Sequence, residues 1–336
     1  MLDRVRRFVR TGESRLLVVL AILVAALAFG TDEFWTVGNF FELLENYSFM
    51  GILALGLLVV LISGGIDISF TAIATVAQYL MAMHLLRQGG NWVTVFAIAG
   101  GIGLLLGAVN ALLVHYTRVP AIIITIATLN VFHGTLIYLT RGRWLYGFPG
   151  WFSKGVDLFS FTSGDGMTYS VNLPIVTLIV VLLVTWFILN RTTVGRKIYA
   201  LGGNPDAAER LGYNILGLHL FTYCYMGLLA GIAAAVQAQI VLTVAPNAIV
   251  GRELEVLAAV VLGGASLTGG QGTVLGTVLG VALIGTLSNG LILLGVSSYW
   301  HQVLLGVVIL VSVSLTAWNA RQQERKRGTH EHEEAA

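Results

Sequence analysis

Apolar segments follow one another along almost the whole chain, and this pattern limits the fold more than any other feature of the sequence. Most of them approach the roughly 20 residues that a helix needs to cross a bilayer. The composition agrees, because 56% of the residues are hydrophobic and 11% are charged, whereas soluble domains carry about 25% charged residues. The sequence therefore predicts an all-α, polytopic membrane protein with about ten transmembrane helices, at residues 16–30, 49–63, 68–86, 93–114, 121–140, 173–189, 217–240, 255–266, 273–294 and 301–318.

The positions of the basic residues predict how the chain is oriented in the membrane. With ten spans and a cytoplasmic N-terminus, 14 of the 19 Lys and Arg residues fall in cytoplasmic stretches, as the positive-inside rule requires. The first apolar segment is then a retained anchor rather than a cleaved signal peptide. We expect a cytoplasmic tail at residues 1–15, a transmembrane domain at 16–318 with a cytoplasmic loop at 190–216, and a cytoplasmic tail at 319–336.

Two glycine-rich breaks interrupt the apolar pattern. The first reads SGGIDIS at residues 63–69, and the second reads LGGASLTGGQG at residues 262–272. Each is a candidate for a broken or re-entrant helix, which is tolerated at membrane depth only where protein or water covers it. Their corresponding places in the two halves suggest an internal repeat and a central pathway. We expect structural or gating roles for Gly64, Gly65, Asp67, Ser69, Gly263, Gly264, Gly269 and Gly270.

Asp67 is the most unusual residue of the first break, because a carboxylate between two apolar segments is costly to bury. The interpretation that we favour is a helix cap, in which side-chain oxygens of Asp67 and Ser69 accept hydrogen bonds from the first amides of the following helix. A direct role for Asp67 in the movement of a solute is the alternative.

The loop at residues 190–216 is the most hydrophilic long stretch between the apolar segments. Within it, NPDAAERLGY predicts a short helix, with Asn204 at the N-cap, Pro205 at the first helical position and Gly212 as the C-terminal stop. A short capped helix at the membrane surface suits docking to another protein, and a linker that faces lipid headgroups is the alternative. The residues expected to make the docking contact are Gly203, Asn204, Pro205, Asp206, Glu209 and Arg210.

The chain lacks the sequence signatures of an enzyme or an ATPase. None of its three lysines follows a glycine, so no GKS or GKT phosphate-binding motif is present. The histidines are scattered singly and Cys224 is the single cysteine, so we expect no metal site. The chain is therefore expected to carry no cofactor, and any ATP hydrolysis is expected on a separate subunit.

Four motifs occur in order along the chain: SGGIDIS (63–69), RVPAIIITIATLNVFHGTLIYLTRG (118–142), TTVGRKIYALGGNPDAAERLGYNI (192–215) and the segment 253–306. Together they resemble the permease subunit of bacterial carbohydrate-uptake ABC transporters of the ribose, galactose, xylose, arabinose and autoinducer-2 type, over roughly residues 45–318. Two departures are Phe70-Thr71, where the family often has Val-Gly, and Gln271, where a basic residue often precedes Gly-Thr.

This resemblance implies a subunit of an ATP-driven importer that moves a sugar or sugar-like solute across the bacterial inner membrane. It implies a partner ATPase with two nucleotide-binding cassettes, which would hold the ATP and Mg, and a periplasmic solute-binding protein, for which the loop 141–172 is a candidate docking surface. It also implies a second permease, either another copy of this chain or a sibling. The lipid bilayer is the remaining expected partner, and no nucleic acid is expected. Residues 202–214 match the family's coupling region, which rides on the ATPase.

A pathway for a neutral polyol is expected to present amides and hydroxyls rather than charges. The candidates are Asn110, Asn130, Gln237, Gln239 and Asn289, and for each of them an ordinary interhelical hydrogen bond is the alternative. A second function stays open, namely an ATP-independent secondary transporter or channel for a small neutral solute. That function calls for a relay of intramembrane ionisable residues, and Asp67 is the only acid between the second and third predicted spans.

Overall fold

The computed structural model describes residues 12–162 and 167–297, together with residues 299, 300, 303, 304, 306, 307 and 310. Most of the expected N-terminal tail, most of the expected last span at 301–318 and all of the expected C-terminal tail at 319–336 lie outside the described residues.

Seven of the described helices are long and apolar enough to cross a membrane. They are α2 (Gly12–Gly30), α3 (Val37–Ile62), α5 (Trp92–Thr117), α6 (Ala121–Thr140), α8 (Leu173–Arg191), α11 (Ile215–Val241) and α13 (Val274–Leu293). Shorter or more polar helices lie between them: α4 (Phe70–Gln88), α7 (Gly150–Lys154), α9 (Thr193–Gly203), α10 (Pro205–Arg210) and α12 (Glu253–Leu262). The chain is therefore a polytopic helical membrane protein, as the sequence predicts.

Two of the expected spans differ from this set for physical reasons. The segment 255–266 forms α12, whose 10 residues extend about 15 Å and cannot cross a bilayer alone. It packs between α3 and α13, so protein surrounds it as a re-entrant element requires. The segment 68–86 forms α4, which has 19 residues but packs against α5, α6 and α11. A helix that faces other helices rather than lipid needs a less apolar surface.

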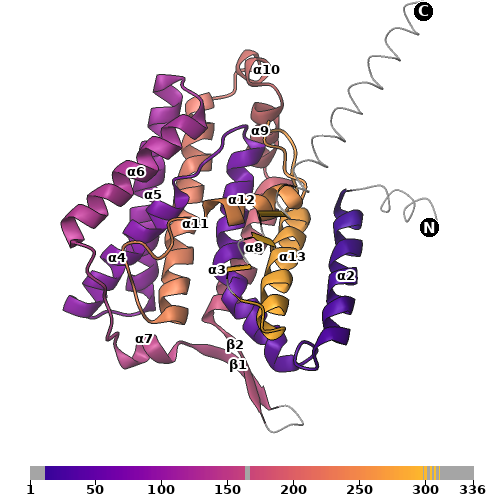
Figure 1. Cartoon of the computed structure of the whole chain (residues 1–336). Helices are drawn as coiled ribbons and strands as arrows, with labels where there is room; N and C mark the ends of the chain where they lie inside the picture. Colours follow the sequence, from indigo (N-terminus) through magenta and orange to yellow (C-terminus); the bar gives the residue numbers. More distant parts are fainter. Residues whose placement is uncertain are drawn as a thin grey trace, which may run out of the picture.

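Helix α3 lies at the centre of the bundle (Figure 1). In its most apolar 18-residue window 83% of the residues are buried, compared with 17% in α2 and in α6. The difference arises because α8, α11, α12 and α13 all pack against α3, whereas α2 contacts mainly α13 and leaves Phe29 exposed. The exposed apolar faces of α2 and α6 suit contact with lipid, and α3 forms the interior of the protein.

Helices α5 and α11 cross in direct backbone contact at a row of small residues. A Cβ atom at Gly103 would lie 2.9 Å from the carbonyl carbon of Gly227, and a Cβ atom at Gly227 would lie 2.9 Å from that of Gly103. Only glycine at both positions permits this approach. Lipid tails provide no hydrophobic drive between helices, so close packing of small residues supplies much of the attraction.

The two ends of the bundle carry different structures (Figure 1). Helices α9 and α10 form a hairpin at one end. The opposite end carries α7 and a small antiparallel sheet of β1 (Asp157–Thr162) and β2 (Thr168–Asn172). The sequence pattern did not predict this sheet. It is held to the bundle by the rings of Phe161 and Tyr169, which pack against Phe41 near the start of α3.

Replacing Gly227 with alanine should destabilise the bundle, because the added methyl group meets the backbone of Gly103 and overpacking of this kind costs about 1–3 kcal/mol. We expect a lower thermal unfolding temperature for the purified Gly227→Ala chain in detergent. Gly101→Ala is the matched control, since a Cβ atom there meets nothing within 4 Å, and it should unfold at or above the wild-type temperature. Equal unfolding temperatures for the two variants would contradict the close contact.

Candidate functional site

Both glycine-rich breaks end their helices with the same hydrogen bonds. After α3 the amide of Gly64 donates to the carbonyl of Leu61 at 2.9 Å, and after α12 the amide of Gly264 donates to the carbonyl of Val261 at 2.9 Å. In both cases the next amide donates to the carbonyl five residues earlier at 3.2 Å. Gly64 and Gly264 have φ angles of 88° and 91°, which L-residues rarely adopt. The similarity of the two breaks therefore extends from sequence to backbone geometry.

The α9–α10 hairpin meets both breaks at one point. The amide of Gly270, in the second break, donates a hydrogen bond to the carbonyl of Ile62 at the end of α3, at 2.9 Å. Gly202, in the last turn of α9, lies against this bond, because a Cβ atom there would collide with the Ile62 carbonyl and lie 2.6 Å from the Gly270 nitrogen. We name this meeting point of Ile62, Gly202 and Gly270 the glycine junction. The hydroxyl of Tyr199 reinforces it by donating to the carbonyl of Gly272 at 2.8 Å.

The other predicted glycines of the breaks also lie in close contacts. A Cβ atom at Gly269 would lie 2.7 Å from the Cα atom of Gly64, and one at Gly65 would lie 2.5 Å from the hydroxyl of Tyr223. Gly263 lies against the backbone of α13. The breaks therefore tolerate little added volume. A gating role for them stays a prediction.

The short helix predicted in the hydrophilic loop is present as α10. The side chain of Asn204 accepts a hydrogen bond from the amide of Ala207 at 2.9 Å, Pro205 occupies the first helical position, and Gly212 has a φ angle of 77° just after the helix. These features confirm the predicted boundaries. The residues expected to dock a partner are all exposed, namely Gly203, Asn204, Pro205, Asp206, Glu209 and Arg210. The docking itself stays a prediction.

Asp67 and Ser69 divide the capping role differently from the expectation. Asp67 is 1% exposed, and its Oδ1 accepts hydrogen bonds from the amide of Ser69 at 2.8 Å and from its hydroxyl at 2.7 Å. Asp67 thus satisfies an amide at the start of α4, as predicted. Ser69 makes no side-chain cap, so that part of the prediction is wrong. Its hydroxyl bonds to the stronger acceptor, the carboxylate, and accepts from Nδ2 of Asn110 at 2.6 Å.

The amides proposed for a pathway lie in several separate places. Asn110 belongs to the network around Asp67. Oε1 of Gln237, on α11, accepts a hydrogen bond from Gln78 of α4 at 3.2 Å. Near the opposite end of the bundle, Nδ2 of Asn289 in α13 donates to Oδ1 of Asn39 in α3 at 2.8 Å. These pairs are interhelical hydrogen bonds, the alternative that the sequence left open.

The remaining two candidate amides, Gln239 and Asn130, lie in two other places. Gln239 lies against Gly155, next to α7, and its Oε1 is buried without a hydrogen-bond partner among the described residues. Asn130 lies on the exposed side of α6 and donates to the carbonyl of Ile126 at 2.8 Å. The five candidates therefore do not face one channel within a single chain, and a role in the pathway stays a prediction for each.

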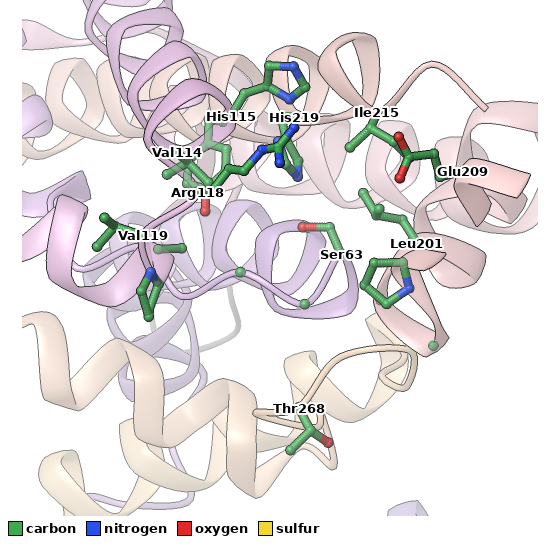
Figure 2. Close-up of a pocket in the computed structure, with 18 residues that line it drawn as sticks. Ser63, Val114, His115, Arg118, Val119, Leu201, Glu209, Ile215, His219 and Thr268 are labelled. Atoms are coloured by element: carbon green, nitrogen blue, oxygen red, sulfur yellow. The ribbon is translucent and has the colours of Figure 1, made fainter. Parts of the chain in front are cut away.

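A cavity of about 720 Å³ lies beside the glycine junction (Figure 2). Its walls come from the first break, the α9–α10 hairpin, the turn between α5 and α6, and the start of α11. They include Ser63, Gly64, Gly65, His115, Arg118, Gly202, Gly203, Glu209, His219, Tyr223 and Thr268. The sequence predicted no metal site at the scattered histidines and gave Arg118 and Tyr223 no role in a site. These residues belong to no common motif and meet only because α5 and α11 cross.

The acidic start of α12 is a second feature that the sequence analysis missed. Glu253 is 9% exposed and accepts hydrogen bonds from the hydroxyl of Thr71 and from the amide of Gly251. Glu255 forms an ion pair with Arg252 at 3.2 Å. The ELEV sequence at residues 253–256 was the available signal. Both carboxylates have partners, so they hold α12 in place. Among the described residues no group of three or more His, Cys, Asp or Glu side chains could hold a metal ion.

Comparisons with known proteins show what the chain is similar to. The family model described as "Branched-chain amino acid transport system / permease component" matches residues 39–313. The ribose import permease protein of Escherichia coli strain K12 is 35% identical over 301 residues, which cover 90% of this chain and 92% of that protein. The ribose import permease protein of Bacillus subtilis strain 168 is 36% identical over 299 residues, covering 89% and 90%.

A relative named for a different substrate is similar over almost the same length. The autoinducer 2 import system permease protein of Yersinia pestis strain Pestoides F is 30% identical over 300 residues, which cover 89% of this chain and 82% of that protein. No solved structure matches the chain.

Replacing Gly202 with alanine should loosen the α9–α10 hairpin, because the new methyl group collides with the Ile62 carbonyl. Limited trypsin digestion of the purified chain, followed by mass spectrometry, reports this directly at Arg196, Lys197 and Arg210. We expect cleavage there to be about tenfold faster, which corresponds to a cost within the usual 1–3 kcal/mol range for overpacking. The neighbouring Gly203→Ala variant is the control, since a Cβ atom there meets nothing within 4 Å. Wild-type cleavage rates in Gly202→Ala would refute the close junction.

Proposed function

Since this chain belongs to the family of branched-chain amino acid transport system permease components, we propose that it is the membrane-spanning subunit of an ATP-driven importer for a sugar or sugar-like solute. The observation that carries the proposal is the glycine junction. It joins an exposed helical hairpin, suited to a partner, to both breaks of the transmembrane bundle. A subunit that converts the movement of a partner into the opening of a pathway needs such a connection.

The chemistry of the bundle supports a neutral polyol rather than an amino acid as the solute. A zwitterion carries two charges that need partners when they leave water. Of the acidic side chains buried in the described bundle, Glu253 accepts hydrogen bonds from Thr71 and Gly251, and Asp67 accepts from Ser69 through Oδ1, which leaves Oδ2 of Asp67 as the carboxylate oxygen there without a partner. Buried amide oxygens without a hydrogen-bond partner among the described residues occur instead on Asn110, Gln239 and Asn289. The substrates for which the relatives are named, ribose and autoinducer 2, agree with this choice.

The proposed assembly contains three further kinds of subunit. An ATPase with two nucleotide-binding cassettes would bind the exposed face of α10 and would hold the ATP and Mg, since this chain has no phosphate-binding motif. A solute-binding protein would deliver the sugar at the opposite end, where α7 and the β1–β2 hairpin lie. A second permease, either a copy or a sibling, would complete the membrane part.

The proposed assembly also implies how this chain is oriented in the bacterial inner membrane. We place both termini and the α9–α10 hairpin in the cytoplasm, because the basic residues concentrate in these stretches. The loop 141–172 then faces the periplasm. Closure of the cassettes would move α10, and the glycine junction would transmit that movement to the ends of α3 and α12, because no side chain separates the backbones there.

Uptake by proteoliposomes tests the transport function. The chain is reconstituted with a double-cassette ATPase and a solute-binding protein, and uptake of labelled ribose, autoinducer 2 and leucine is measured. We expect uptake of a sugar-type solute that requires ATP on the side of the membrane where the ATPase is bound. This uptake should stop when the ATPase is omitted. Uptake that persists without ATP would instead support a secondary transporter or channel. ATP-dependent uptake of leucine alone would contradict the sugar assignment.

Charge reversal on α10 tests the docking site. Replacing Asp206 and Glu209 with lysine should reduce co-purification of the ATPase by about tenfold or more, because it reverses two exposed charges on the proposed docking helix and so changes the electrostatic complementarity of the interface. The control carries the same two charge changes at Asp32 and Glu33, in an exposed turn at the other end of the bundle. Both variants are first checked for membrane insertion. Equal co-purification of the ATPase with the two variants would rule out α10 as the docking element.

A further inference from the structure

Three basic side chains gather on one wall of the cavity beside the glycine junction. Figure 2 shows His115, Arg118 and His219 close together, with Glu209 on the facing wall. The rings of His115 and His219 are 5.5 Å apart between centroids. His115 belongs to the last turn of α5, Arg118 follows that helix directly, and His219 lies in the second turn of α11. The wall is therefore assembled from two helices that meet only in the folded chain.

This basic wall lacks a neutralising partner. Within the described ranges, the ion pair found is that of Arg252 with Glu255, far along the chain from the cavity. Neither Arg118 nor the two histidines make an ion pair with a described carboxylate. Glu209 lines the same cavity but is exposed on α10. A guanidinium beside two imidazole rings, with no acid in contact among the described residues, favours an anion from outside the chain.

Two buried polar atoms at this cavity also lack partners. The hydroxyl of Tyr223, a residue only 1% exposed, has no hydrogen-bond partner among the described residues, and neither does Nδ1 of His219. Both residues line the cavity. An unsatisfied buried donor or acceptor costs about 1–3 kcal/mol, so native structures rarely leave such atoms without a ligand or water. Arg118 lines the same cavity.

We propose that this cavity is a binding site for a phosphate group, with Arg118, His115, His219 and Tyr223 as its donors. A phosphate offers several acceptor oxygens, which match a guanidinium, imidazole N–H groups and a phenolic hydroxyl. A neutral sugar would not neutralise the charge of Arg118. The volume of about 720 Å³ exceeds that of phosphate alone, so the group is expected to arrive attached to a small solute or a lipid headgroup.

The location of the site gives it a consequence for the proposed transport cycle. Its walls include Ser63, Gly64 and Gly65 of the first break and Gly202 and Gly203 of the hairpin. A bound phosphate compound would hold these two elements together and resist their relative movement. That consequence, and the access of the site from the cytoplasm, rest on the proposed function, whereas the binding itself does not.

Binding to the purified full-length chain, without any ATPase, tests the site independently of transport. Delipidated protein in a phosphate-free detergent is titrated with inorganic phosphate, ribose 5-phosphate and ribose, and binding is followed by calorimetry and by the thermal unfolding temperature. We expect binding of the phosphate compounds, a higher unfolding temperature, and at least tenfold weaker binding of ribose. Ribose binding as tight as that of ribose 5-phosphate would overturn the proposal.

A second arm separates a lipid headgroup from a free phosphate compound. Native mass spectrometry of protein purified without delipidation reports retained phospholipid. Retention of phospholipid that Arg118→Asn abolishes, with no binding of the free phosphate compounds, assigns the site to a lipid headgroup. Binding of the free compounds assigns it to a phosphorylated solute. The absence of both would overturn the proposal.

Two variants and a control localise the binding. Asparagine is chosen at position 118 because Arg118 has a φ angle of 56°, which asparagine tolerates better than most residues. Arg118→Asn should weaken phosphate binding about tenfold or more, as expected for loss of a charge-assisted hydrogen bond. Tyr223→Phe removes only the hydroxyl and tests the site even if Arg118→Asn fails to fold. Arg196→Gln removes an exposed charge from α9, outside the cavity, and should bind normally. Unchanged binding in both site variants would refute the site.

Discussion

The backbone contact between Gly202 and the carbonyl of Ile62 is the constraint on which the functional part of this structure depends. A side chain at position 202 would separate the hairpin from the end of α3 and would displace the hydrogen bond from Gly270 to Ile62. Without that bond the second break would lose its hydrogen bond to the end of α3. The absence of a side chain at Gly202 thus allows three segments that are widely separated in sequence to meet.

The rest of the fold supports this junction in a way that suits a membrane. Helix α3 is enclosed by other helices, so its end at Ile62 is fixed in the interior. Helix α12 needs no lipid-facing surface because α3 and α13 cover it. The non-helical backbone of the first break is buried or faces the cavity, which is the condition for irregular backbone at membrane depth. The second break exposes Gly264, Leu267 and Gln271. Close crossings such as that of Gly103 with Gly227 supply the packing that lipid cannot drive.

Features with local causes could be predicted from the sequence. The boundaries of α10 follow from Asn204, Pro205 and Gly212, because capping depends on residues a few positions apart. The breaks at Gly64 and Gly264 follow for the same reason, and hydropathy located the long spans. Hydropathy measures how apolar a segment is, not what covers it. It therefore could not separate the short re-entrant α12 or the enclosed α4 from helices that face lipid.

Features that depend on distant segments could not be predicted. The cavity unites residues of α5, α11 and the first break, and no spacing in the sequence records that α5 and α11 cross there. The same limit applies to the proposed pathway amides, which share a chemistry but not a location. It also applies to Ser69, where the carboxylate of Asp67 competes successfully for the hydroxyl that a helix cap would use.

The central claim is that the α9–α10 hairpin and both breaks respond as one unit. Hydrogen–deuterium exchange of the reconstituted chain, measured with and without the ATP-bound ATPase, tests it most directly. The account predicts that exchange in residues 199–211, 62–69 and 263–273 changes together, and that the Gly202→Ala chain loses the response in both breaks. A change confined to the hairpin, with both breaks unaffected, would contradict it.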